Sequence, residues 1–111
     1  MTKQNPVIIY IGSQGEEFEA LVQPWIVIQP QEMMEALAMV LFWYPDLVIL
    51  EETAAFAHDI YMHLRSINME DILILSDHPQ DWEVPVGSAV QVLPLDTPLE
   101  ALVPQTPELT Y

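Results

Sequence analysis

Short apolar runs recur along the chain, and polar or proline-containing segments separate them. Five of these runs have the nearly unbroken apolar character of strands that are covered on both faces. They span residues 7–11, 25–28, 47–50, 72–75 and 89–93. Because Val and Ile are frequent in them, the pattern favours strand over helix. We therefore predict five short, buried strands.

Segments of helical character lie between and after these runs, each bounded by Gly, Pro or polar residues. They span residues 14–23, 31–44, 53–67 and 98–103. Alternation of strand and helix implies right-handed crossovers and a parallel sheet with helices on both faces. The predicted fold is α/β, a flavodoxin-like doubly wound sheet of five parallel strands in the order 2-1-3-4-5.

The interval before the last strand breaks this alternation. Residues 76–88 include Pro79, Pro85 and Gly87, which leave little room for a stable helix. We expect a loop or a single turn there, so that the fourth helix is shortened or missing. A chain of 111 residues suffices for one hydrophobic core. We predict one domain, 1–111, with a frayed, proline-punctuated tail at 104–111.

Composition excludes several classes of protein. A hydrophobic fraction of 51% is too high for a disordered chain, and the absence of cysteine excludes disulfides, thiol catalysis and Cys-based zinc sites. Residues 1–6 are polar and lack the charged start, apolar stretch and cleavage site of a signal peptide. We expect a cytoplasmic protein.

The charge is strongly acidic. Two Lys and Arg residues stand against 17 Asp and Glu residues, giving a formal net charge of −15. Nucleic acids and anionic membrane surfaces are recognised by clustered Lys and Arg, so we expect neither as a partner. The apolar stretch 33–44 contains Glu35 and ends at Pro45, well short of the ~20 residues that a membrane-spanning helix needs. The acidity indicates a solvated surface or recruitment of a basic partner.

In an open parallel sheet, ligands bind outside the carboxyl ends of the strands. Residues at the five predicted strand ends are Gly12-Ser13, Gln29, Glu51-Glu52, Ser76-Asp77 and Leu93-Pro94. Segment 45–51 resembles the third strand of response-regulator receiver domains (CheY-like), with Glu51 at the place of the phosphoacceptor aspartate. Two further similarities are Leu64-Arg65 late in a predicted helix and the hydroxyl residue Ser76 at the end of segment 72–76. Residues 93–96 read Leu-Pro-Leu-Asp where the family has Lys-Pro-Phe-Asp.

The resemblance also implies what the chain has lost. Receiver chemistry uses an acid pair that holds Mg²⁺, a phosphoacceptor aspartate, a hydroxyl and a lysine. Here Gly12 and Ser13 replace the acid pair, Glu51 the aspartate and Leu93 the lysine, whereas Ser76 keeps the hydroxyl. Because positioned cations supply most of the catalysis in phosphoryl transfer, we expect a degenerate pocket with no catalytic residue, metal or cofactor. Glu51 is then either a permanent mimic of the phosphorylated state or a solvated acid.

A rival resemblance concerns the first loop. Residues 9–17 look like the phosphate loop of flavodoxins, where glycine and hydroxyl residues lead into a helix that binds the FMN phosphate. Glu16 and Glu17 in the first helical turn oppose a phosphate there. His58 and His63 are five apart, on different faces of a helix, and do not indicate a metal pair.

The predicted second helix is unusually apolar, since eleven of the twelve residues from 33 to 44 are hydrophobic. A helix that packs one face on a sheet needs only an apolar stripe. We place one set of side chains toward the sheet, namely Met33, Leu37, Val40, Leu41 and Tyr44. Met39, Phe42 and Trp43 are then left on the flank. They either cover sheet area exposed by the missing fourth helix, together with Trp82, or form an interface.

Together these features predict a non-catalytic receiver-like signalling module that acts through a protein partner or through itself, most simply as a homodimer. The predicted interface comprises Met39, Phe42, Trp43 and Trp82. Two alternatives remain open at this point. One is a phosphorylatable receiver of a two-component phosphorelay, with Glu51 or Asp46 as acceptor. The other is a small FMN or nucleotide binder that uses residues 12–15.

Overall fold

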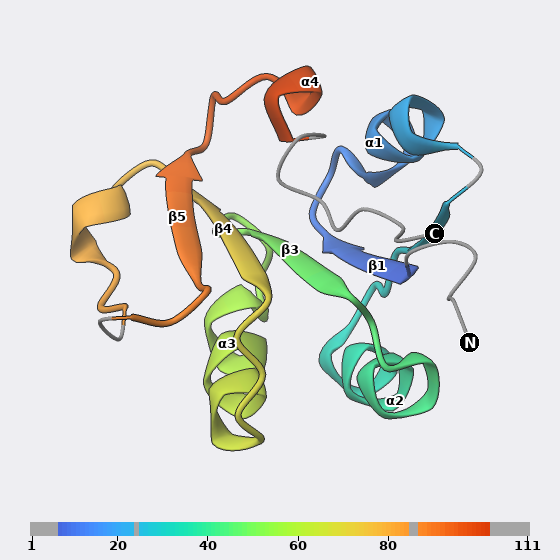
Figure 1. Ribbon diagram of the computed structural model, residues 1–111, viewed down its shortest axis with the longest axis horizontal. Helices are drawn as coiled ribbons and strands as arrows, with labels where there is room; N and C mark the ends of the chain where they lie inside the picture. The colour runs from blue at the N-terminus through green and yellow to red at the C-terminus, as the bar shows by residue number, and fades with distance from the viewer. Residues whose placement is uncertain (1–6, 24, 85–86, 103–111) are drawn as a thin grey trace.

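Five parallel strands form the centre of the molecule (Figure 1). The computed structural model describes residues 7–23, 25–84 and 87–102, so the predicted frayed tail lies outside the described residues. The strand order is β2-β1-β3-β4-β5, which confirms the predicted doubly wound α/β fold. The strands are β1 (Val7–Ile11), β2 (Ile26–Ile28), β3 (Leu47–Glu51), β4 (Ile72–Ser76) and β5 (Gln91–Pro94).

Helices cover both faces of this sheet. They are α1 (Gly15–Val22), α2 (Met33–Trp43), α3 (Ala57–Ser66) and α4 (Leu99–Leu102). Figure 1 shows α1 and α4 on one side of the sheet and α2 and α3 on the opposite side. Each of these helices lies within a predicted helical segment. α3 begins at Ala57 rather than at residue 53, where the predicted segment starts, because turns follow the end of β3.

Alternation along the strands divides the core into two layers. Ile9, Ile11, Val48 and Leu50 pack toward α2 and α3, whereas Tyr10 and its neighbours on the other face pack toward α1 and α4. Every residue of β1, β3 and β4 is buried. β2 and β5 are edge strands with exposed positions, so the prediction of burial on both faces is right for the three central strands only.

The connection between β4 and β5 contains the predicted single turn. It is the 3-10 helix η1 (Pro79–Asp81), and Pro79 at its start suits the first position of a helix. Trp82 and Val84 follow and pack against the same core layer as α2 and α3. One large indole thus covers sheet area that a fourth helix covers in a complete doubly wound fold.

The predicted orientation of α2 is partly wrong. Ala36 and Val40 are buried and Met33, Leu37 and Met39 pack partly buried against the core. Leu41 and Tyr44, which were expected to face the sheet, are exposed, and Met39 is not on the flank. The reason is that the stripe of buried contacts ends at Val40, whereas α2 continues for three more residues to Trp43. Tyr44 takes the left-handed conformation, with φ 48°, and its N–H donates to the Val40 carbonyl.

Within residues 7–23, 25–84 and 87–102, no helix is long and apolar enough to cross a membrane.

Candidate functional site

The carboxylate of Glu51 lies at the carboxyl ends of the strands, where sequence predicted a degenerate phosphoacceptor pocket. Glu51 is the last residue of β3 and is only 2% exposed, so the expectation of a solvated acid is wrong. Its Oε1 accepts hydrogen bonds from the N–H of Ser13 (3.0 Å) and from the Ser13 hydroxyl (3.1 Å). Its Oε2 accepts hydrogen bonds from the hydroxyl of Tyr10 (2.6 Å) and the N–H of Gln14 (3.2 Å).

These donors belong to β1 and to the loop that leads from it into α1. Backbone N–H groups at the start of a helix lack partners within the helix and carry partial positive charge. Gln14, at the N-cap of α1, makes no side-chain capping hydrogen bond. Glu51, coming from a different strand, instead places its negative charge at this helix end. The two N–H groups donate to the carboxylate over 3.0 Å and 3.2 Å, and these contacts tie β3 to the first crossover.

Gly12 makes room for that contact. A Cβ on Gly12 would lie 2.3 Å from Cδ of Glu51 and 2.6 Å from its Oε2. Its φ of 154° is also a conformation that other residues rarely adopt. Any side chain at position 12, including the acid that the resemblance to receiver domains would call for, is therefore incompatible with the Glu51 conformation seen here. Gly12, Ser13 and Glu51 are brought together as predicted, but as an internal hydrogen-bonded cluster.

Burial raises the pKa of the Tyr10 hydroxyl above its ordinary value, and the hydrogen bond and negative charge of Glu51 raise it further. The phenol therefore stays protonated and remains a donor to Glu51.

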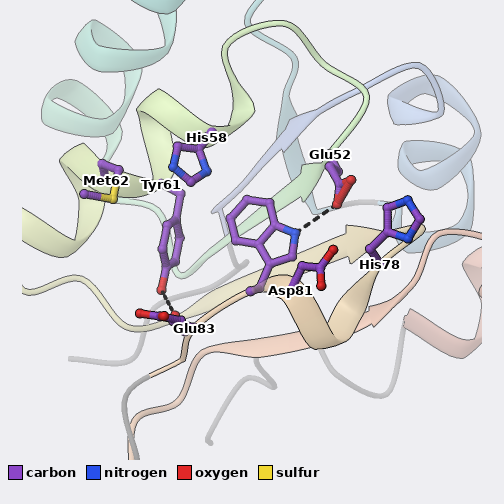
Figure 2. Close-up of a pocket in the computed structure, with 8 residues that line it drawn as sticks. Glu52, His58, Tyr61, Met62, His78, Asp81 and Glu83 are labelled. Atoms are coloured by element: carbon purple, nitrogen blue, oxygen red, sulfur yellow. Dashed lines mark hydrogen bonds between the residues drawn. The ribbon is translucent and has the colours of Figure 1, made fainter.

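Ser76 belongs to a different cluster from Glu51. Its hydroxyl is buried and donates to the Glu52 carboxylate, which also accepts a hydrogen bond from Trp82 Nε1 at 2.9 Å (Figure 2). The contact between His78 and Ser76 uses the backbone N–H of His78, at 2.9 Å, rather than the imidazole. These hydrogen bonds, that of Ser76 first and that of Trp82 second, hold the pKa of Glu52 below its ordinary value.

Leu93, which the resemblance to receiver domains matched to a lysine, is half-buried in β5 and packs toward α1 and α4. It supplies no charge to the strand ends. No group of three or more His, Cys, Asp or Glu residues that could hold a metal ion occurs in the described part of the chain.

The loop between β1 and α1 also bears on the flavodoxin resemblance. The N–H groups of Ser13 and Gln14, which a phosphate would need, are engaged by Glu51. A hollow of about 310 Å³ beside this loop is lined mainly by neutral side chains. Its lining comprises Ile11, Gly12, Ser13, Pro30, Gln31, Thr53, Ala54, Ala55 and Phe56. A bound phosphate would have to displace a buried carboxylate to reach the loop.

Sequence reasoning missed the role of Tyr10 and the pairing of Glu52 with Trp82. Tyr10 carries the one polar group among the side chains of β1. It pairs with Ile49, two residues before Glu51 on the same face of the sheet, so strand register was the available signal. No such signal existed for Glu52 and Trp82, because they are 30 residues apart and meet only through η1.

Comparison of the chain with family models, with curated proteins and with solved structures found no match.

The fit between Gly12 and Glu51 predicts a measurable coupling. Gly12→Ala should lower the free energy of unfolding by about 1–3 kcal/mol, because the added methyl group collides with Glu51. Glu51→Ala should also destabilise, since it strands buried donors at a cost of about 1–3 kcal/mol. The double variant should cost less than the sum by roughly 0.5–3 kcal/mol in urea unfolding.

Gly87→Ala is the control for that cycle. Gly87 also has positive φ, 84°, but no heavy atom lies within 4 Å of a Cβ built there. Gly87→Ala should therefore change the free energy of unfolding by the same amount in the wild-type chain and in the Glu51→Ala variant. Additive costs for Gly12→Ala and Glu51→Ala would contradict the contact.

The raised pKa of Tyr10 predicts that the free energy of unfolding falls at alkaline pH. Because its pKa is raised in the folded protein, the phenol is neutral in both states below its ordinary pKa. Above about pH 10 the unfolded chain loses this proton while the folded chain keeps it, so stability should fall by about 1.4 kcal/mol per pH unit. Tyr10→Phe should be less stable at neutral pH, where it lacks the hydrogen bond to Glu51, and less sensitive to alkali. The measurement is urea unfolding of both proteins across this pH range. If the free energies of unfolding of the wild type and of Tyr10→Phe fell in parallel with pH, the raised pKa of Tyr10 would be contradicted.

Proposed function

We propose that this chain is a non-catalytic, receiver-like interaction module that forms a homodimer through the C-terminal end of α2. The observation that carries the proposal is an exposed apolar surface formed by Leu41, Phe42, Trp43 and Tyr44, hereafter the α2 patch. Leu41 is 63% exposed, Phe42 75% and Tyr44 79%. Adjacent large apolar side chains with such exposure are typical of surfaces that bind another protein.

Tyr44 adds support from backbone geometry. It occupies the position after α2 in the left-handed conformation, where glycine is favoured and other residues carry a backbone cost of about 1–3 kcal/mol. Its exposed ring gains little packing within the chain to offset that cost. A tyrosine in this left-handed position is consistent with packing of its ring against a second molecule.

A groove beside the α2 patch offers a place for a side chain from the second copy. It has a volume of about 430 Å³ and lies between the end of α2 and the loop from α3 to β4. Its residues are Val40, Leu41, Tyr44, Pro45, Ile67, Asn68, Met69, Glu70 and Asp71. Because the patch and the groove share residues, a two-fold arrangement can bury both in both copies.

Charge distinguishes a second copy from a basic partner. The α2 patch itself contains no charged residue, whereas the whole chain carries a formal charge of −15. Two copies therefore repel one another at long range and attract through apolar contact at the patch. Salt screens the first effect and leaves the second, so self-association should strengthen with salt.

The non-catalytic part of the proposal rests on Glu51. Its carboxylate is buried and accepts four hydrogen bonds, which would have to break before it could attack a phosphoryl group, and this supports the proposal. Asp46, the alternative acceptor, lies just before β3 at the opposite edge of the sheet, where its Oδ2 accepts the N–H of Val7 at 2.8 Å. Neither acid has a metal ligand set beside it among the described residues.

Light scattering on the full chain tests the dimer. Raising NaCl from about 0.1 M to about 1 M shortens the Debye length from roughly 10 Å to roughly 3 Å and should shift the protein from monomer toward dimer. Phe42→Glu should weaken dimerisation by about tenfold or more while the protein stays folded. Tyr44→Gly should weaken it and raise the stability of the monomer by about 1 kcal/mol.

Leu21→Glu is the matched control, because Leu21 is an exposed apolar residue on α1, on the other side of the sheet. It should leave the dimer unchanged. A monomer at every salt concentration would refute the homodimer. Dimerisation that weakens with salt would refute the α2 patch as its interface and would point to a charged interface instead.

Incubation with acetyl phosphate and Mg²⁺, followed by intact-mass measurement, tests the loss of phosphoacceptor chemistry. We expect no gain of a phosphoryl group, because neither a dication site nor a lysine lies at the strand ends of the described chain to stabilise the transferred charge. A stoichiometric gain that Glu51→Gln abolishes would overturn the non-catalytic assignment and leave the α2 patch to be judged by light scattering alone.

A further inference from the structure

A separate hollow lies between α3 and the segment around η1 (Figure 2). Its volume is about 560 Å³. The residues that line it are Glu52, His58, Tyr61, Met62, His78, Asp81, Trp82 and Glu83. Figure 2 shows Glu52 and Asp81 on the same side of this set as His78, and Glu83 beside Tyr61.

Aromatic rings form the wall of this pocket. The centroid of Trp82 lies 5.3 Å from that of Tyr61, in an edge-to-face arrangement, and 5.4 Å from that of His58. The indole is fixed by its hydrogen bond to Glu52, and the Tyr61 hydroxyl donates to the Glu83 carbonyl at 3.4 Å. The wall is therefore formed and oriented before a ligand arrives, which lowers the entropic cost of binding.

Acidic side chains complete the lining. Glu52, Asp81 and Glu83 contribute three carboxylates, and no lysine or arginine is among the lining residues. Arg65 lies elsewhere on α3, where its guanidinium donates to the Met69 carbonyl at 3.1 Å. The lowered pKa of Glu52 keeps its carboxylate ionised at neutral pH. Aromatic faces and ionised carboxylates together favour a cation, because both attract positive charge.

We propose that this pocket binds a guanidinium group, presented as an arginine side chain on an exposed segment of a protein partner. A guanidinium is planar, stacks on an indole and can donate to a carboxylate with two parallel N–H groups. A lysine ammonium is compact and more strongly hydrated, so it fits an aromatic wall less well. The chain's formal charge of −15 favours the approach of a basic segment to this acidic surface.

This inference goes beyond the proposed dimer and does not depend on it. The α2 patch is uncharged and lies at the end of α2, whereas this pocket is charged and lies beside η1. Salt should strengthen dimerisation and weaken guanidinium binding, so the two proposals can fail separately.

The test follows the indole N–H of Trp82 in nitrogen–proton correlation spectra of the full chain, with the resonance identified by Trp82→Phe. The probe is the capped tripeptide acetyl-Gly-Arg-Gly-amide, compared with its Lys analogue at matched ionic strength. We expect a saturable shift with the Arg peptide and binding weaker by about threefold or more with the Lys peptide. No saturable shift, or equal binding of both peptides, would overturn the proposal.

Variants locate the site. The double variant Asp81→Asn/Glu83→Gln changes exposed side chains and should weaken binding by about tenfold. Glu52→Gln should weaken it as well, and the dispersion of its spectrum reports whether the fold is kept. Glu100→Gln, which removes an exposed acid on α4 across the sheet, should bind as the wild type does. Equal affinity of the double variant and the wild type would refute the pocket.

Free arginine, used as a third probe, distinguishes the sources of the guanidinium. The charges of its α-ammonium and α-carboxylate groups cancel, and it lacks the flanking peptide groups, so it should bind no more tightly than the capped peptide. Tighter binding of free arginine than of the peptide would overturn the assignment to a protein partner.

Discussion

Much of this structure depends on one carboxylate held against the start of one helix. Glu51 projects from the end of β3 and accepts the N–H groups of Ser13 and Gln14, so the centre of the sheet and the first crossover share a hydrogen-bonded cluster. The cluster requires glycine at position 12 and a protonated phenol at position 10. Glu51 thus holds two elements of the fold together. The proposed loss of receiver chemistry and the local architecture are thus two aspects of the same arrangement.

The fold could be predicted because the apolar runs of the central strands leave few alternatives. Val48, Ile49 and Leu50 are wholly buried, as an unbroken apolar run in a parallel sheet requires. Pro79, Pro85 and Gly87 were enough to predict that the fourth crossover is short. The orientation of α2 was harder, because a helix that is apolar on nearly every side has no polar face to mark its direction. Leu41 and Tyr44 were misplaced for that reason.

The candidate site was predicted in part. Gly12, Ser13 and Glu51 do meet, since parallel strands bring their carboxyl ends to one edge. Their conformation was not predictable, because whether a carboxylate faces solvent or turns inward depends on donors far away in sequence, here Tyr10 and the loop before α1. The separation of Ser76 from Glu51 has a similar cause. Adjacent acids 51 and 52 point to opposite faces of the strand, as the alternation of side chains requires, and Ser76 meets only the second.

The shortened fourth crossover has a consequence for motion. A helix protects a sheet through many cooperative contacts, whereas the segment around η1 depends chiefly on Trp82, anchored to Glu52 and packed on Tyr61. This segment and the edge strand β5 should therefore open together as a low-stability unit, well before the three central strands exchange their amide protons. The same indole forms part of the wall of the acidic pocket. A ligand bound there would therefore stabilise the closed form and lower the population of the locally opened state.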